Sequence, residues 1–224
     1  MIPRILHFTW IGDESKRPDN CIQTWRDHHP GWEIRIWGND DLKLHGWWLG
    51  EEMMFMRDRE LNGVADMMRW QILWEYGGIV VDADSICLQR LRSSMLRHEA
   101  FACWENEMVR PGLIAAGYVG SEPGVDFWKK VARDIKGSGI MRPDRHSMMA
   151  WQTVGPLRLT ESYRKHRYHN LHIFPSHYFI PTHCTGLTYT GRGPVYADQL
   201  WGSTKQSYDT LHTLDVSDES SVRS

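Results

Sequence analysis

The sequence lacks any long hydrophobic run and any marked excess of charge of one sign. Its 224 residues include 26 Lys and Arg against 28 Asp and Glu, which leaves a formal net charge of -2. Such a balance gives no electrostatic attraction to nucleic acid or to an anionic membrane surface. A membrane-spanning helix needs about 20 mostly apolar residues, and no stretch approaches that length. We therefore expect neither a nucleic-acid partner nor a membrane span.

Cysteine is also scarce, and its spacing excludes the common metal and redox motifs. Cys21, Cys87, Cys103 and Cys184 are widely separated, with no CxxC pair and no Cys/His cluster at zinc spacing. The N-terminal segment MIPRILHFTWIG is too short an apolar run for a signal peptide and lacks a cleavage site of small residues. These features favour a reducing compartment, so we expect a cytoplasmic protein.

What the sequence does contain is an alternation of strand-like and helix-like segments. Residues 63–76 place apolar side chains at helical spacing, and Gly77 and Gly78 follow in the position of a helix C-cap. Residues 79–81 are apolar on both faces, which is typical of a strand at the centre of a covered sheet. The other expected strands are residues 4–10, 32–37, 100–104, 113–119 and 171–175, and the other expected helices are 18–27, 40–48, 124–135 and 151–163.

This alternation predicts an α/β fold with a mostly parallel central sheet flanked by helices. We expect one domain over residues 1–206. Residues 207–224 are polar and rich in Ser and Asp, which predicts a flexible C-terminal tail.

Two carboxylates stand at the end of the buried strand, in the stretch IVVDADS. Asp82 and Asp84 follow the strand directly, and in parallel sheets the ligand crevice lies beyond the carboxyl ends of the strands. Paired carboxylates suit Mn²⁺ or Mg²⁺, which commonly shares such ligands with the phosphates of a substrate. The alternative is a turn in which both side chains cap backbone N–H groups.

A second polar pair lies on the helix that leads into this strand. Asp66 and Arg69 are three residues apart and therefore share one face of the helix. They form either an ordinary ion pair on the helix surface or a polar site on a helix that is otherwise apolar.

Several blocks of the sequence occur together in an order that resembles a known family. These are IPRILHFTWIG, HPGWEIRIW and ADMMRWQILWEYGGIVVDADSICLQRL, followed by the sparser VGPLRLT, IFPSHYFIP and YADQLWGS. Together they resemble the sugar-nucleotide glycosyltransferases of family 32. The resemblance implies a GT-A fold and a metal-dependent transfer of sugar to a glycan acceptor, with retention as the favoured stereochemistry. A UDP-sugar donor is favoured, with GDP-mannose as the other choice.

The resemblance also implies roles for residues near the two carboxylates. Asp84 is expected to bind the metal directly, while Asp82 and Ala83 approach the sugar or ribose. Asp66 and Arg69 are expected to bind hydroxyl groups of the donor sugar. The nucleotide pocket is expected to include His7, Phe8, Thr9, Trp10, Ile11 and Gly12, with Trp10 stacking on the base.

The late block YADQLWGSTK departs from the family pattern. Gln199 stands where many relatives carry a His that binds the metal, and Asp198 stands beside it. Either residue is a candidate further ligand, or the metal keeps extra waters. Ser203 and Lys205 are expected to meet the diphosphate, unless they are solvated loop residues.

The acceptor side is less defined. Glu105 and Glu107 follow an expected strand and, with Asp144, are candidates for lining the acceptor cleft. An inverting enzyme needs a general base of this kind, whereas a retaining enzyme does not. All three are otherwise ordinary surface charges.

Two other functions remain open from the sequence. A haloacid-dehalogenase-type phosphohydrolase also places DxD after an apolar strand, but it usually carries Thr or Val where this chain has Ile86. A non-catalytic sugar- or nucleotide-binding module is the other alternative. The chain is also compatible with being one domain of a larger multi-domain transferase.

Overall fold

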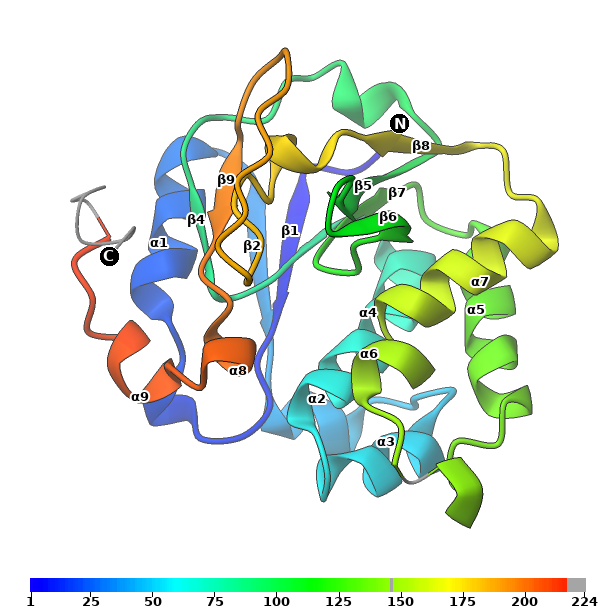
Figure 1. The fold of residues 1–224 in the computed structure, drawn as a ribbon. Helices are drawn as coiled ribbons and strands as arrows, with labels where there is room; N and C mark the ends of the chain where they lie inside the picture. Colours follow the sequence, from blue (N-terminus) through cyan, green and yellow to red (C-terminus); the bar gives the residue numbers. More distant parts are fainter. Residues whose placement is uncertain (146, 217–224) are drawn as a thin grey trace.

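A seven-stranded sheet runs through the middle of the computed structural model, which describes residues 1–145 and 147–216. The strand order is β2-β1-β3-β7-β5-β6, and β8 also pairs with β5 (Figure 1). The strands are β1 (Ile5–Thr9), β2 (Glu33–Trp37), β3 (Gly78–Val81), β5 (Ala100–Asn106), β6 (Arg110–Ile114), β7 (Tyr118–Ser121) and β8 (Leu171–Phe174), with β4 (Ser85–Cys87) and β9 (Ala197–Gln199) forming a separate antiparallel pair.

Helices pack on both faces of the sheet (Figure 1). They are α1 (Asp19–His28), α2 (Asn39–Leu44), α3 (Gly50–Arg57), α4 (Leu61–Tyr76), α5 (Asp126–Gly137), α6 (Ala150–Thr153), α7 (Pro156–His166), α8 (Gly202–Lys205) and α9 (Tyr208–Leu211). Short 3-10 turns cover Glu14–Lys16, Met95–Arg97, Pro143–Arg145 and Ser176–Tyr178.

Most strands of the main sheet run in one direction. β1 is parallel to β2 and β3, and β8 is parallel to β5. β7 is antiparallel to both β3 and β5, so β3 and β5 share a direction, and only β6 and β7 are reversed. The carboxyl ends of β1, β3 and β5 therefore meet at one edge of the sheet. The predicted α/β architecture with a mostly parallel sheet is confirmed.

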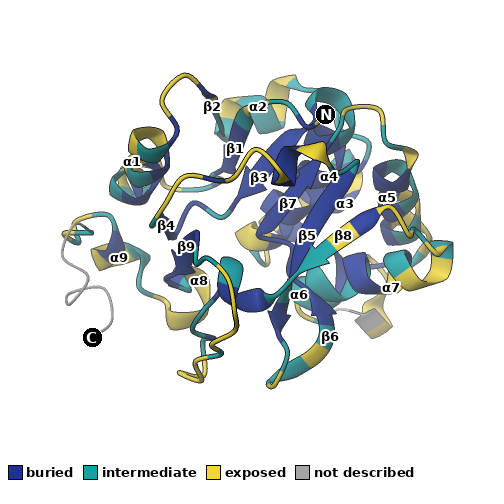
Figure 2. Ribbon diagram, turned by 90° about the horizontal axis from the view of Figure 1, so that it is seen from above, coloured by how far each residue is buried: buried dark blue, intermediate teal, exposed yellow. Residues whose placement is uncertain are grey.

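The core has one large apolar cluster on each face of the sheet. The central strands β1, β3, β7 and β5 between them are almost fully buried, whereas β2, β6 and β8 are partly exposed (Figure 2). Helix α4 is buried without interruption from Gly63 to Leu73. A helix that is apolar all round belongs in a core, so the two charged residues within this run need partners. No helix in the described part of the chain is long and apolar enough to cross a membrane.

The C-terminal segment differs from expectation. Residues 208–211 form α9, in which the Leu211 side chain is buried, and Asn20 on α1 donates hydrogen bonds to the carbonyls of Leu211 and Leu214 at 2.9 Å. The segment from residue 207, expected to be a flexible tail, is therefore packed against the protein at least to Leu214. The sequence does not indicate this packing, because the buried Leu211 is surrounded by polar residues. Residues 217–224 of that expected tail lie outside the described residues.

Three local expectations also change. The expected strand 113–119 is split between β6 and β7, the expected helix 40–48 ends at Leu44, and α3 was not expected.

Candidate functional site

The chain enters the site through a glycine turn between α4 and β3. Gly77 and Gly78 have φ values of +61° and +84°, a region that residues with a Cβ rarely adopt. The turn sends β3 back beside β1, and Asp82 follows at the sheet edge, where its N–H donates to the Gly117 carbonyl at 3.0 Å. Both aspartates of the DxD thus lie in the short turn between β3 and β4.

Arg69 joins the aspartate pair to helix α4. Its Nη1 donates to Asp66 Oδ1 at 2.8 Å and to the Ala116 carbonyl at 3.1 Å, and its Nη2 donates to Asp82 Oδ1. The Arg69 side chain is only 8% exposed, whereas that of Asp82 is 27% exposed. The structure therefore brings the two polar pairs together, and Asp82 is the member that faces solvent.

Burial sets the charge state of Asp66. It raises the pKa of the Asp66 carboxyl to about 7, although the adjacent Arg69 guanidinium acts in the opposite sense. Its protonated form, which can donate as well as accept a hydrogen bond, is therefore favoured relative to that of an exposed aspartate.

Asp84 is held from the C-terminal part of the chain. Its Oδ1 accepts a hydrogen bond from Gln199 Nε2 at 2.9 Å, and its Oδ2 accepts from the Gly202 N–H at 2.6 Å and the Tyr208 hydroxyl at 3.4 Å. Tyr118 fixes the Gln199 amide in turn, at 2.6 Å. Burial, reinforced by the charge of Asp82, raises the pKa of the Asp84 carboxyl to about 6.

Two glycines allow the backbone to approach these carboxylates. A Cβ on Gly117 would lie 2.2 Å from Asp82 Oδ2, and a Cβ on Gly155 would lie 2.3 Å from Asp66 Oδ2. Neither distance is compatible with a larger residue unless the carboxylate moves. Neither glycine was predicted as part of the site, because their role depends on contacts between distant segments.

The expected nucleotide segment is only partly accessible. His7 and Phe8 are fully buried: His7 Nε2 bonds the Gly77 carbonyl at 2.9 Å, and Nδ1 accepts from Trp37 Nε1 at 3.1 Å. Burial lowers the pKa of His7 to about 4, so the ring is neutral. The side chains of these two residues thus lie inside the protein, where the His7 ring makes its hydrogen bonds to other parts of the chain.

The other members of that segment differ in exposure. Thr9 and Ile11 are also buried, at 6% and 8% exposure, so they offer little side-chain surface. Trp10 and Gly12 are half-buried, and the Trp10 ring meets the Tyr208 ring edge-on with centroids 4.9 Å apart. Trp10 therefore lies next to the residue that contacts Asp84. Tyr208 was missed because its segment was expected to be a tail.

Of the two candidate further ligands, Gln199 contacts Asp84 and Asp198 faces elsewhere. In the β4–β9 pair Gln199 is opposite Ser85 and Asp198 is opposite Ile86, and successive residues of a strand point to opposite faces. No group of three or more His, Cys, Asp and Glu side chains that could hold a metal occurs among residues 1–145 and 147–216. Asp82 and Asp84 are therefore a pair of acidic side chains rather than part of a larger acidic or histidine cluster in the described residues, and the Ala83 side chain between them is buried.

The other predicted site residues differ in their exposure and in their contacts. Ser203 and Lys205 are exposed on α8, directly after the Gly202 N–H that caps Asp84. Glu107 accepts hydrogen bonds from the Ser176 N–H, at 2.8 Å, and from its hydroxyl, so it anchors a loop. Asp144 lies exposed in the 3-10 turn Pro143–Arg145, and Glu105 is buried at the end of β5.

Sequence comparison places the site within a known family region. Residues 15–102 match the family described as the glycosyltransferase sugar-binding region containing the DXD motif. Inositol phosphoceramide mannosyltransferase 3 of Schizosaccharomyces pombe is 27% identical over 144 residues, which cover 60% of this chain and 37% of that protein. The chain therefore matches little more than a third of that relative's length.

Solved structures with the same architecture are glycosyltransferases. The PaToxG glycosyltransferase superposes with a TM-score of 0.54 at 13% identity, over 74% of this chain and 70% of that one. The galactosyltransferase LgtC, solved with donor and acceptor sugar analogues, superposes with a TM-score of 0.52 at 12% identity, over 96% and 98% of the two chains. At these identities the likeness establishes the fold, which is GT-A as predicted.

Proposed function

We propose that this chain, a DXD-containing glycosyltransferase of the family-32 type, transfers a sugar from a nucleotide-sugar donor to a hydroxyl group of a glycan acceptor. One observation supports this function most strongly. The DxD carboxylates, the Asp66–Arg69 pair and the cap on Asp84 come from three separate segments, namely the β3–β4 turn, α4 and the C-terminal part of the chain, and meet at the carboxyl edge of the sheet.

We further propose that the reaction depends on Mn²⁺ or Mg²⁺ held by Asp82 and Asp84. The fit rests on the chemistry of the donor set: the two carboxylates repel each other, since Asp82 helps raise the pKa of Asp84, and a divalent cation held by them would offset that repulsion. A hard cation that keeps several waters and shares substrate phosphates needs only one or two protein carboxylates. When bound, the metal would neutralise charge that develops on the departing diphosphate.

The residues around the carboxylates would orient the donor. Arg69 already fixes Asp66 and Asp82, so the groups proposed to bind sugar hydroxyls need no rearrangement. We propose that Trp10 stacks on the nucleotide base, a contact worth about 1–3 kcal/mol. Exposed Ser203 and Lys205 would meet the diphosphate.

The donor and stereochemistry follow as finer proposals. We favour a UDP-sugar, with GDP-mannose as the alternative because the S. pombe relative is named as a mannosyltransferase. We also propose retention, because Glu105 and Glu107 are both engaged in contacts within the protein.

The four free thiols fit a reducing, cytoplasmic location, and the partial match to the relative fits a domain of a larger transferase.

The test is thermal unfolding with UDP, GDP or no nucleotide, each in Mn²⁺ and in EDTA. A ligand at 100 times its dissociation constant adds about 2.7 kcal/mol to the free energy of unfolding. For a domain of this size that raises the midpoint by roughly 5–10 °C. We expect a shift that needs both nucleotide and Mn²⁺ and disappears in Asp84→Asn.

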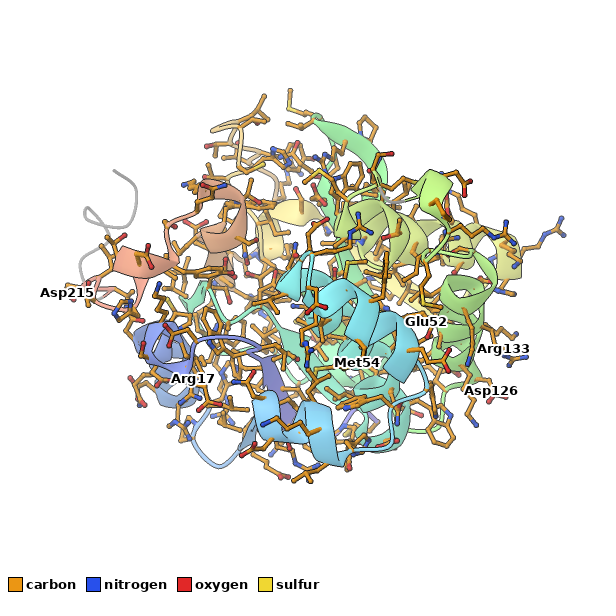
Figure 3. All side chains as sticks on the ribbon, turned by 90° about the horizontal axis from the view of Figure 1, so that it is seen from below. Arg17, Glu52, Met54, Asp126, Arg133 and Asp215 are labelled. Carbon is orange, nitrogen blue, oxygen red and sulfur yellow. The ribbon has the colours of Figure 1, made fainter. Side chains whose placement is uncertain are left out.

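The matched control is Asp126→Asn, an exposed aspartate on the flank of the molecule (Figure 3). It should keep the full shift. Absence of a shift with either nucleotide in the unaltered protein would overturn the metal–diphosphate proposal and restore the phosphohydrolase and the binding module as candidates.

A further inference from the structure

A recess with a cationic lining lies between helices α5 and α7, which pack side by side (Figure 1). Its volume is about 260 Å³, less than the roughly 300–1,000 Å³ of pockets that hold drug-sized ligands. The lining residues are Arg133, Asp134, Gly137 and Ser138, from α5 and its end, with Arg158 and Lys165 of α7. None of these residues belongs to the proposed donor site.

Asp134 contributes a carboxylate to the lining, but its charge is matched within the protein. Its Oδ1 accepts a hydrogen bond from Lys165 Nζ at 2.5 Å, and its Oδ2 accepts from the Ser162 hydroxyl and from His166 Nε2, both at 2.8 Å. Burial acts to raise the pKa of Asp134, yet these hydrogen bonds hold it below its ordinary value. The ionised Asp134 therefore joins α5 to α7 and fixes the position of Lys165.

Two cations of the lining come from α7 and are held in place. The Arg158 side chain is 15% exposed, its Nη1 lies 2.9 Å from Glu161 Oε2, and its Nε donates to the Thr153 carbonyl at 3.3 Å. Lys165 is bonded to Asp134 and is 65% exposed. Because both side chains are already oriented, a ligand in the recess would meet two positioned cations.

Arg133 is the third cation, and its charge is not matched by a carboxylate. It forms no ion pair among residues 1–145 and 147–216, and its Nε meets the Lys129 carbonyl at 3.4 Å. The side chain is exposed at the edge of the molecule (Figure 3). Lys130 and Lys136, three residues before and after it on α5, also lack an ion pair in the described part of the chain. An anion could therefore bind Arg133 without breaking an existing ion pair.

The end of helix α5 does not account for these cations. A helix C-terminus attracts positive charge because its last carbonyls have no partner within the helix. Here Ser138 supplies the partners: its N–H donates to the Asp134 and Ile135 carbonyls at 3.0 and 3.1 Å, and its hydroxyl donates to the Ile135 carbonyl at 2.6 Å. The arginines are thus not needed as hydrogen-bond donors at this helix end.

The chemistry of the lining favours a phosphate group. Two guanidinium groups and one ammonium group offer charge-assisted donors, and an arginine fork matches two oxygens of a phosphate. Three cations against one carboxylate give the recess excess positive charge, although the whole chain has a net charge of -2. None of the lining residues is aromatic, so the recess offers no surface on which a nucleotide base would stack.

We propose that the recess formed by Arg133, Arg158 and Lys165 binds a phosphate group, at an anion site separate from the donor site. A free phosphate and the phosphomonoester headgroup of a lipid present the same oxygens to these residues, and the experiments below distinguish the two sources. The inference goes beyond the proposed transferase function and does not depend on it, because it uses no residue of the donor site.

Calorimetric titration with inorganic phosphate tests the site directly. It is done in EDTA and without nucleotide, so that no metal can hold phosphate at the DxD, and at an ionic strength kept constant with chloride. We expect saturable binding in the unaltered protein. Arg133→Ala should weaken it about tenfold, the loss that corresponds to one hydrogen bond to a charged group, and Arg133→Glu should abolish it.

Arg26→Ala is the matched control. Arg26 is an exposed arginine on α1 that, like Arg133, forms no ion pair in the region described by the structure. Its removal should leave phosphate binding unchanged. The thermal midpoint without ligand should be the same in the Arg26→Ala and Arg133→Ala variants and the unaltered protein, so that a loss of binding does not reflect unfolding.

Vesicle sedimentation distinguishes the two sources of phosphate. The vesicles are phosphatidylcholine alone, or phosphatidylcholine with an equal share of phosphatidic acid or of phosphatidylserine, which is anionic but has no phosphomonoester. Binding to phosphatidic acid vesicles that inorganic phosphate displaces would identify a lipid headgroup as the ligand. Binding of inorganic phosphate by a protein that sediments with no vesicle would identify free phosphate. Either result supports the site.

Four results would overturn the site. The first is no binding of inorganic phosphate or of phosphatidic acid vesicles, and the second is unchanged binding in Arg133→Glu. Equal binding to the two kinds of anionic vesicle would show a diffuse surface charge instead of a phosphate site. A larger loss in Lys205→Ala than in Arg133→Ala would place the phosphate at the proposed donor site.

Discussion

Asp66 is a carboxylate on a buried helix, and its environment makes the stability of the protein depend on pH. Burial raises the pKa of Asp66 to about 7 and that of Asp84 to about 6, both above the value of about 3.9 expected in the unfolded chain. Between those values the folded state binds more protons than the unfolded state. The stability contributed by these groups is therefore complete below about pH 4 and is lost as pH rises through 6 and 7.

We predict that Asp66→Asn removes part of this pH dependence. From pH 5 to 7.5 in EDTA, the free energy of unfolding of the unaltered protein should fall more than that of the variant, by about 1–3 kcal/mol. Urea unfolding at a series of pH values measures both slopes. Parallel slopes would show that Asp66 ionises in the folded protein as it does in the unfolded chain.

The absence of a side chain at Gly117 leaves room for the Asp82 carboxylate. In Gly117→Ala the new Cβ meets Asp82 Oδ2, so the carboxylate must move. We expect a loss of about 1–3 kcal/mol in stability from overpacking. Asp82 is one of the two proposed metal ligands, so its displacement should also make the metal-dependent nucleotide shift shrink or vanish. Gly137→Ala is the control, because a Cβ there meets nothing within 4 Å; an equal effect of both changes would contradict the steric explanation.

At the scale of elements, the sequence predicts those whose pattern is local. Helix α4, its glycine stop and the buried strand β3 follow from periodicity and composition, and so does the DxD at the strand end. The β4–β9 pair has three residues in each strand, too few to show a period, and its strands are more than a hundred residues apart. The cap on Asp84 depends on that pair. The sequence therefore predicts the carboxylates but not what holds them.

The packing of α4 provides a prediction of its own. A Cβ on Gly63 would lie 2.7 Å from Met56 Cγ and 2.8 Å from Ala150 Cβ, where α3, α4 and α6 meet. In an isolated helix Gly→Ala stabilises by about 1 kcal/mol, but overpacking costs about 1–3 kcal/mol. We expect Gly63→Ala to be destabilising on balance. Gly50→Ala, in α3 with nothing within 4 Å of the new Cβ, should be neutral or stabilising. Chemical unfolding measures the stability of both variants. If Gly63→Ala were stabilising, α3 and α6 would be able to move away from α4 at little cost and make room for the new Cβ.

At the scale of the whole molecule, the C-terminal segment packs against the N-terminal part of the chain next to the site. The segment after β9 returns to the N-terminal part of the chain. Lys16, in the 3-10 turn before α1, pairs with Asp209 at 2.5 Å, and Asn20 on α1 donates a hydrogen bond to the Leu211 carbonyl at the end of α9. The exposed ion pair contributes little by itself. The buried Leu211 side chain contributes about 1.5–3 kcal/mol, and the same segment places the Tyr208 hydroxyl on Asp84. Binding at the DxD and the stability of the C-terminal segment should therefore be coupled.

Truncation tests this coupling. A chain that ends at Gln206 loses α9, so its free energy of unfolding should fall by about 2 kcal/mol or more, since the apolar burial of Leu211 is lost. The Trp10 ring loses its Tyr208 neighbour, so the metal-dependent nucleotide shift should weaken as well. A chain that ends at Val216 keeps every one of these contacts and should match the full chain in both measurements. The shorter chain could instead keep the full metal-dependent nucleotide shift while losing stability. In that case α9 would stabilise the fold without contributing to the nucleotide site, and the proposed stacking would need Trp10 alone.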